Sequence, residues 1–279
     1  MDGLLIIDKP SGPTSHDVVA RVRRALRERR IGHTGTLDPA ATGVLLLVLG
    51  RATRLARFLS ASDKSYEAVV RLGFATDTAD AQGRALEPVF QGSLPSHDTI
   101  DAALDIFRGP FLQRPPAFSA KKIDGKRSHE LARARVRAGV APSHFAPSHL
   151  ASSDAPPDLP PPASVTVHRL ALVSVDADRV TLSLDCSAGF YVRSLAHDLG
   201  ERLGVGAHLA TLRRTRSADF TIDQAIDLGT AERDPQGAAA AIIPLADMLP
   251  TWTGCVAIVI ALRRRQQAAP PATGTVIDV

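Results

Sequence analysis

The 279-residue sequence has only two cysteines, Cys186 and Cys255, and they lie far apart in the chain. Two such cysteines exclude a disulfide framework and the paired Cys-x-x-Cys spacing of structural zinc sites. Aromatic residues make up only 4% of the chain. Each tyrosine and tryptophan therefore carries more information than usual.

Long hydrophobic runs are also missing. The longest strongly apolar runs, 44–49 and 255–262, are far too short to cross a bilayer as a helix. The first ten residues contain four consecutive apolar residues and no basic segment, which is not the pattern of a signal peptide. We therefore expect a cytoplasmic protein without a membrane segment.

Positive charge is concentrated in two places, although the net charge is only +4. Residues 105–140 hold nine basic and three acidic side chains, and residues 21–30 hold six arginines and one glutamate. Either run alone is typical of a solvated helix face. Both together in one modest chain favour a polyanionic partner such as nucleic acid.

The hydrophobic pattern predicts a mixture of strands and helices. Alternation or short apolar runs predict strands at 4–7, 66–73, 165–175 and 180–186. Helical spacing predicts amphipathic helices at 18–29 and 192–203, the second ended by Gly204. Thr14 and Asp17 have the spacing of a capping box for the first helix, with Ser15 as a competing N-cap. Because no regular βαβ repeat is present, the pattern indicates an α+β fold.

Two segments are not expected to form folded domains. Residues 141–163 contain seven prolines and two copies of the sequence APSH, which predicts a disordered insertion or linker. His144 and His149 in this segment have no cysteine or carboxylate partner at ligand spacing, so a metal site is disfavoured. The segment from residue 251 onward is too short for an independent domain.

Residues 32–43 form the most unusual segment of the chain, with three glycines, a histidine, three threonines and an Asp-Pro pair just before the apolar run 44–49. A polar, glycine-rich loop beside a core strand is a common place for functional groups. Pro39 keeps Asp38 out of the helical region. Asp38 is therefore either a catalytic carboxylate or the first residue of a plain Asp-Pro turn. His33 has the same two interpretations.

Blocks along most of the chain resemble, in family order, the TruB-type family of bacterial tRNA pseudouridine-55 synthases. They lie at 8–15, 32–43, 49–53, 63–67, 72–80, 113–120, 124–127, 186–193 and 212–214. The resemblance implies an isomerase that converts one uridine in the T-loop of tRNA, at position 55, to pseudouridine. It also implies a mixed, largely antiparallel central sheet flanked by helices. Residues 1–250 would be the catalytic domain, with a basic thumb-like RNA-binding insertion at 105–140. Residues 251–279 would be a truncated or degenerate remnant of a C-terminal RNA-binding domain.

The resemblance also implies roles for individual residues. Asp38 matches the family's nucleophile, and Arg193 matches the arginine that pairs with it. Tyr66 matches the aromatic residue that stacks on the target base, and its hydroxyl would assist removal of the proton from C5. His33 would occupy the place that the flipped uridine leaves. The expected substrate-binding set is His33, Tyr191, Leu212, Lys9, Thr36, Lys121, Lys126 and Arg127.

The expected partner is the T-arm of tRNA, and the expected state is a monomer without a cofactor, a metal or an obligatory protein partner. A non-catalytic tRNA-binding protein or chaperone remains an alternative from a different class. A pseudouridine synthase that depends on a guide RNA is a second alternative. A metal-dependent hydrolase is disfavoured, because His33 and Asp38 have no ligand partners at a known spacing.

Overall fold

The computed structural model describes residues 1–119, 121–123, 126–128, 130–131, 134 and 160–248. Most of the proline-rich stretch 141–163, and the whole of the expected C-terminal remnant 251–279, lie outside this range. At the end of the proline-rich stretch, residues 160–162 carry no regular structure and a strand begins at Ala163. No helix in the described part of the chain is long and apolar enough to cross a membrane.

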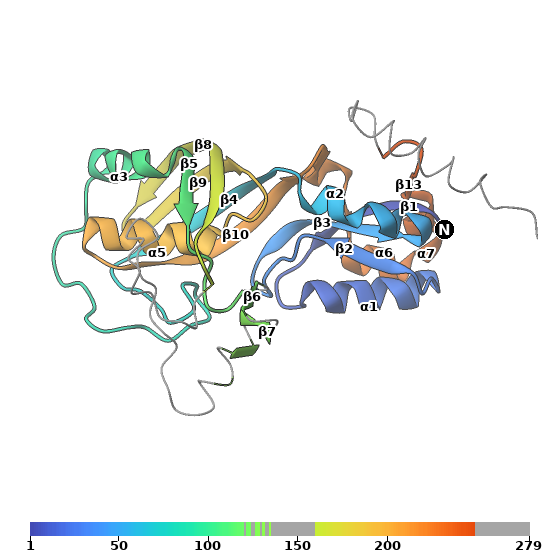
Figure 1. The fold of residues 1–279 in the computed structure, drawn as a ribbon, viewed down its shortest axis with the longest axis horizontal. Helices are drawn as coiled ribbons and strands as arrows, with labels where there is room; N and C mark the ends of the chain where they lie inside the picture. Colours follow the sequence, from blue (N-terminus) through green and yellow to red (C-terminus); the bar gives the residue numbers. More distant parts are fainter. Residues whose placement is uncertain (120, 124–125, 129, 132–133, 135–159, 249–279) are drawn as a thin grey trace, which may run out of the picture.

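One large sheet forms the centre of the molecule (Figure 1). Its main path runs through β12 (Ile226–Asp227), β1 (Gly3–Lys9), β3 (Thr42–Leu49), β10 (Ala207–Ser217), β4 (Lys64–Leu72), β9 (Arg179–Cys186), β8 (Ala163–Asp176) and β5 (Gly109–Gln113). Three strands join it at the side: β2 (Ile31–Thr34) on β3, β11 (Phe220–Thr221) on β10 and β13 (Ile243–Pro244) on β1. Among these described strands, β1 with β12 and β3 with β10 are parallel and the other pairs are antiparallel. The predicted α+β fold with a mixed, largely antiparallel sheet is therefore confirmed.

The half of the sheet around β1 and β3 is covered on both faces. Helix α1 (Ser15–Leu26) packs with α6 (Leu228–Arg233) and α7 (Pro235–Ala240) on one face. The 3-10 helix η1 (Gly50–Leu55) and α2 (Ala56–Ser60) cover the other. Since both faces of β3 are buried, its sequence is apolar at consecutive positions rather than alternating.

Helix α1 begins as its sequence predicts but ends earlier. Thr14 is the N-cap, and the capping box with Asp17 is present in both directions. Ser15 is the first helical residue and uses its hydroxyl elsewhere. The helix was expected to run to residue 29, but it ends at Leu26 because Arg27 adopts a left-handed conformation with φ of 51°.

The other half of the sheet packs against α3 (His97–Leu104), the 3-10 helix η2 (Asp105–Phe107) and α5 (Val192–Leu203). The predicted strands of this half correspond to β4, β8 and β9, and α5 ends at Gly204 as expected. The remaining 3-10 helix is η3 (Ile222–Gln224).

The two halves meet where β3 and β10 pair over a short stretch, with Gly43 opposite Arg214. Gly43 has φ of +100°, and a Cβ at this position would lie 2.2 Å from the carbonyl oxygen of Arg214. Only glycine allows the two strands to approach so closely. This junction brings the loop before β3 next to the side chains of β4, β10 and α5.

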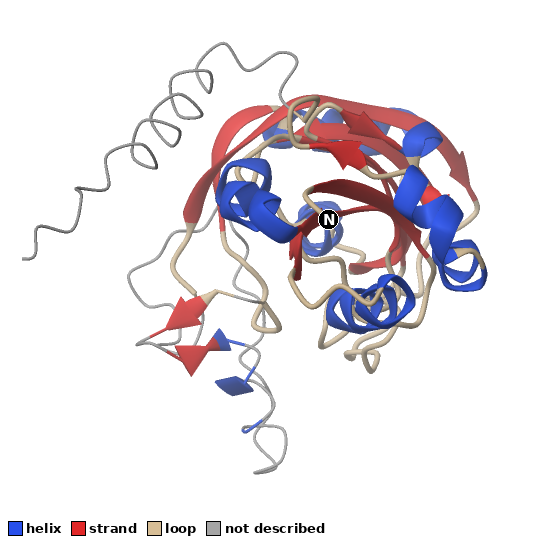
Figure 2. Cartoon of the chain, turned by 90° about the vertical axis from the view of Figure 1, so that its right-hand side faces the viewer, coloured by secondary structure: helices blue, strands red, loops and turns tan. Residues whose placement is uncertain are grey.

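The described part of the thumb-like insertion contains a separate hairpin of β6 (Lys122–Ile123) and β7 (Lys126–Arg127), which projects from the main sheet (Figure 2). The boundary expected at residue 105 needs correction. Strand β5 pairs with β8 in the main sheet, so the chain leaves the sheet only after Gln113. Within the basic stretch, Arg108 is already paired with Asp101 and Asp105.

Candidate active site

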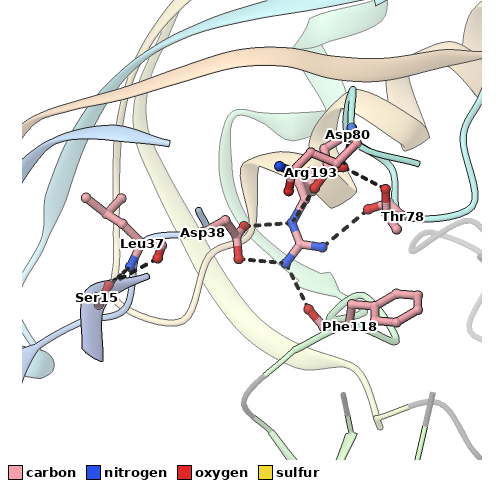
Figure 3. Close-up of polar contacts among 8 residues, drawn as sticks. Ser15, Leu37, Asp38, Thr78, Asp80, Phe118 and Arg193 are labelled. Atoms are coloured by element: carbon pink, nitrogen blue, oxygen red, sulfur yellow. Dashed lines mark hydrogen bonds and ion pairs between the residues drawn. The ribbon is translucent and has the colours of Figure 1, made fainter. Parts of the chain in front are cut away.

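Asp38 lies in the loop between β2 and β3, and its neighbours hold the loop from two sides. The Ser15 hydroxyl accepts a hydrogen bond from the Leu37 amide at 2.9 Å and donates to the Leu37 carbonyl at 3.1 Å (Figure 3). The Lys9 ammonium donates to the carbonyls of Pro39 at 3.0 Å and Ala41 at 2.7 Å. The main chain is thereby fixed on both sides of the carboxylate.

Lys9 was expected in the substrate-binding set, but the structure places it beneath the loop. Its side chain is fully buried, and its ammonium bonds to three main-chain carbonyls. Burial lowers the pKa of Lys9 to about 8, against the attraction of Asp38, which raises it. These contacts indicate that Lys9 holds the loop in place and does not contact a ligand in the pocket.

Arg193, in the first turn of α5, lies against the Asp38 carboxylate. Its Nε is 2.9 Å from one carboxylate oxygen, and its Nη2 donates to the other at 3.3 Å. The remaining donors bond to the carbonyls of Thr78 at 3.3 Å and Phe118 at 2.9 Å, and Asp80 lies 3.9 Å away (Figure 3). The Arg193 side chain is 6% exposed, whereas the Asp38 side chain is 40% exposed. The arginine is therefore held inside the protein, and the carboxylate faces solvent. This two-point pairing sets the direction of the carboxylate.

A pocket of about 590 Å³ opens around this pair. It brings together six of the sequence-predicted residues: Asp38, Tyr66, Arg193, Tyr191, Leu212 and Thr36. His33 does not line it, although His16, against which the His33 ring packs, does. Lys121 is exposed on the thumb-like insertion, and the side chains of Lys126 and Arg127 lie outside the described part.

Two tyrosines form walls of the pocket. Burial raises the pKa of Tyr66, and the neighbouring Arg214 acts in the opposite direction. Burial also raises the pKa of Tyr191. The buried amide of Gln113 holds the backbone of Tyr191, accepting from its N–H at 2.8 Å and donating to its carbonyl at 3.0 Å. The end of β5 is thus tied to the N-cap residue of α5.

The chain matches two family models: TruB family pseudouridylate synthase, N-terminal domain, over residues 23–154, and tRNA pseudouridylate synthase B C-terminal domain over residues 193–233. The tRNA pseudouridine synthase B of Solibacter usitatus is 43% identical over 258 residues, which cover 90% of this chain and 80% of that protein. The chain belongs to the TruB family of pseudouridylate synthases. The protein of the same name from Corynebacterium diphtheriae is 43% identical, over 84% of this chain and 73% of its own.

Solved structures of similar proteins share the fold described above. The archaeal box H/ACA Nop10–Cbf5 complex matches with a TM-score of 0.56 and 30% identity over 83% of this chain. A Cbf5–Nop10–Gar1 complex matches with a TM-score of 0.61 and 29% identity over 87%. This TruB-family chain spans 53% and 60% of those two chains, respectively. The segment matched as a C-terminal domain contains α5 and β10, so it is part of the central sheet.

Sequence reasoning assigned no role to three charged residues of the TruB-family pocket. Asp80 accepts hydrogen bonds from the Thr78 hydroxyl and the Gln82 amide and lies beside Arg193. Arg214 is 1% exposed and donates to the carbonyls of Val44 and Gly35. Lys64 is buried, which lowers its pKa to about 8. The sequence could have indicated all three as pocket residues, because each lies within a block that resembles the family.

His33 is expected to make stability depend on pH. Burial, together with His16 and Arg214, lowers its pKa from 6.5 to about 4. Between pH 6.5 and pH 4 the unfolded chain therefore binds a proton that the folded protein does not. The free energy of unfolding should fall as pH drops through this window. Urea denaturation measures the free energy of unfolding at pH 7.5 and at pH 5. This free energy should fall less between the two pH values for His33→Gln than for the wild type. The exposed His97→Gln on α3 controls for the loss of any histidine, and parallel curves for wild type and His33→Gln would contradict this account.

Proposed function

We propose that the chain converts one uridine in the T-loop of tRNA, at position 55, to pseudouridine, with Asp38 as the nucleophile. The observation that carries the proposal is the Asp38 carboxylate, held by the buried Arg193 and turned toward an open pocket with aromatic walls. Membership of the TruB family and the names of the relatives support the reaction and the tRNA substrate.

The reaction is an isomerisation without a net redox change. The Asp38 carboxylate attacks either the uracil ring or the ribose C1′. The bond between C1′ and N1 breaks, the base rotates in the pocket, and a bond forms between C1′ and C5. The C5 hydrogen then leaves as a proton, and N1 takes up a proton. The pocket must therefore hold the free base between the two steps, and the walls formed by Tyr66, Tyr191 and Leu212 are suited to that task.

Tyr66 would stack on the uracil and assist removal of the C5 proton. Burial raises the pKa of Tyr66 and so further favours the neutral phenol. Arg214 lowers the pKa of Tyr66, which is the direction that a proton-accepting tyrosine requires. The overall shift of the Tyr66 pKa is upward, so acceptance of the C5 proton would depend on contacts that form only when the substrate is bound.

The target uridine must leave the folded loop to reach Asp38, which costs a few kcal/mol. Stacking on an aromatic side chain such as Tyr66 returns roughly 1–3 kcal/mol. His33 would fill the vacated place in the RNA. Thr36, exposed beside the pocket, and the thumb residues Lys121, Lys126 and Arg127 would contact the RNA.

We expect the protein to act alone, as a cytoplasmic monomer without a cofactor. The tRNA pseudouridine synthase B relatives are 36–44% identical to this chain, whereas the chains matched in the two Cbf5 complexes are 29–30% identical. This difference favours stand-alone action over dependence on a guide RNA.

The test is tritium release from C5-labelled uridine in a T-arm hairpin, with purified protein and no other component. Release should occur from a hairpin labelled at the target uridine and not from one labelled only in the stem. Binding without release would favour the RNA-chaperone alternative. Release only after addition of a guide RNA would favour the guide-dependent alternative.

A further inference from the structure

Helix α1 begins at the rim of the candidate pocket. Thr14, Ser15 and His16, at its N-terminal end, line the pocket. The helix has 12 residues and is therefore about 18 Å long. Figure 1 shows it running away from the thumb hairpin along the outside of the sheet. Any groups on its exposed face thus form a path that leads from the pocket outward.

That exposed face is basic. Positions 16, 20 and 24 are exposed and spaced by four residues, so they follow one face of the helix. Arg27, the left-handed C-cap residue, is exposed just past the end of the helix. Beyond His16 and Ala20, this face carries Arg24, and Arg27 follows at the C-terminal end of the helix. We call these two arginines the α1 stripe. Together with Arg23 and Arg29 they line a surface depression that contains one acidic residue, Glu28.

The acidic groups near the α1 stripe are already engaged. Glu232 pairs with Arg21, and Glu28 pairs with the N-terminal ammonium at 3.0 Å. Asp17 is committed to the capping box with Thr14. Within the described part of the chain, Arg24 and Arg27 make no hydrogen bond or ion pair to a side chain or carbonyl. Arg24 acts on Glu232 through its charge and helps to lower the pKa of that carboxyl. Exposed guanidinium groups without a hydrogen-bonded partner suit a ligand that brings phosphates.

We propose that the α1 stripe binds the phosphate backbone of the RNA stem that carries the target loop. The inference rests on the proposed function, since a uridine seated at Asp38 forces the flanking backbone across the pocket rim. Arg24 and Arg27 lie 8 and 11 residues beyond His16. They are therefore about 12 and 17 Å along the helix axis, too far for the nucleotides in the pocket but within reach of the paired stem.

A second basic surface also begins at the pocket rim and is the alternative binding site for the RNA stem. Helix α2 ends at the rim at Ser60, and exposed Arg54 and Arg57 lie before it in η1 and α2. Arg57 is already placed 4.5 Å above the ring of Phe58, an internal cation–π contact. The α1 stripe is favoured because, among the described residues, neither of its arginines has a cation–π contact of the kind that Arg57 makes.

The experiment compares two hairpins that share the target loop. One has its stem cut to the pairs nearest the loop, and the other has a stem longer than α1. Binding and tritium release are measured for wild type, R24A/R27A, R54A/R57A and R179A/R202A. The last variant removes the same charge from exposed positions at the start of β9 and the end of α5, in the other half of the sheet.

For R24A/R27A we expect binding of the long hairpin to weaken about tenfold and the slope of log K against log salt to fall by about two. Binding of the short hairpin, and kcat on both, should stay at wild-type values, as should all values for R179A/R202A. Equal losses on both hairpins, no loss, or a loss confined to R54A/R57A would overturn the assignment. If wild type releases tritium from neither hairpin, the proposed function fails. If wild type releases tritium and R24A/R27A behaves like it, only the stripe fails.

Discussion

Replacing Asp38 with asparagine is expected to lower kcat for pseudouridine formation by at least about a thousandfold. Asparagine has nearly the same shape as aspartate, and its amide oxygen can still accept a hydrogen bond from Arg193. It has no charge and is a poor nucleophile, so the covalent step is lost while the pocket keeps its form. Tritium release under single-turnover conditions measures the loss, and filter binding at the same RNA concentrations should remain close to wild type.

Asp80→Asn is the matched comparison for this variant. It makes the same chemical change in the same pocket, at a carboxylate that lies 3.9 Å from Arg193 and lacks the two-point pairing of Asp38. Since Asp80 acts on the position of Arg193, we expect a loss on the order of ten- to a hundredfold. Should Asp38→Asn keep activity within about tenfold of wild type, the nucleophile lies elsewhere, and Asp38 only neutralises Arg193.

Local sequence patterns predicted the elements that hold the site but not the contacts between them. The capping box at Thr14 and the alternation in β4 and β9 depend on neighbouring residues, so the sequence displays them directly. Gly43 is different, because its role depends on Arg214, which lies 171 positions further along the chain. No window of the sequence contains both partners.

Two predictions from the sequence were wrong because they depended on contacts with distant parts of the chain: Lys9 as a substrate-binding residue, and residue 105 as the start of the thumb-like insertion. Lys9 looks like an ordinary charged residue at the end of a strand, and lysine is rarely buried completely. Its burial follows from three carbonyls, two of which belong to a loop 30 and 32 residues away. The count of basic residues likewise placed Gly109–Gln113 in the thumb-like insertion, whereas the pairing of that segment with β8 places it in the sheet.

Arg193→Gln is expected to lower the free energy of unfolding by roughly 3 kcal/mol and to abolish measurable activity. Arg193 is almost fully buried and serves the Asp38 carboxylate together with the carbonyls of Thr78 and Phe118. Glutamine has neither the charge nor the reach to replace these bonds. Arg193→Lys keeps the charge without the two parallel donors, so we expect a smaller loss of stability and a large loss of activity. Urea denaturation and tritium release on the same preparations measure both effects.

The double variant Asp38→Asn/Arg193→Gln separates two origins of this loss. If the cost of Arg193→Gln comes from leaving the Asp38 carboxylate unpaired, the same substitution should cost less once that carboxylate is an amide. The double variant would then be more stable than the sum of the single changes predicts, by about 1 kcal/mol or more. Strict additivity would mean that Arg193 stabilises the fold through Thr78 and Phe118 alone. The Asp38–Arg193 contact would then orient the nucleophile without contributing to the stability of the protein.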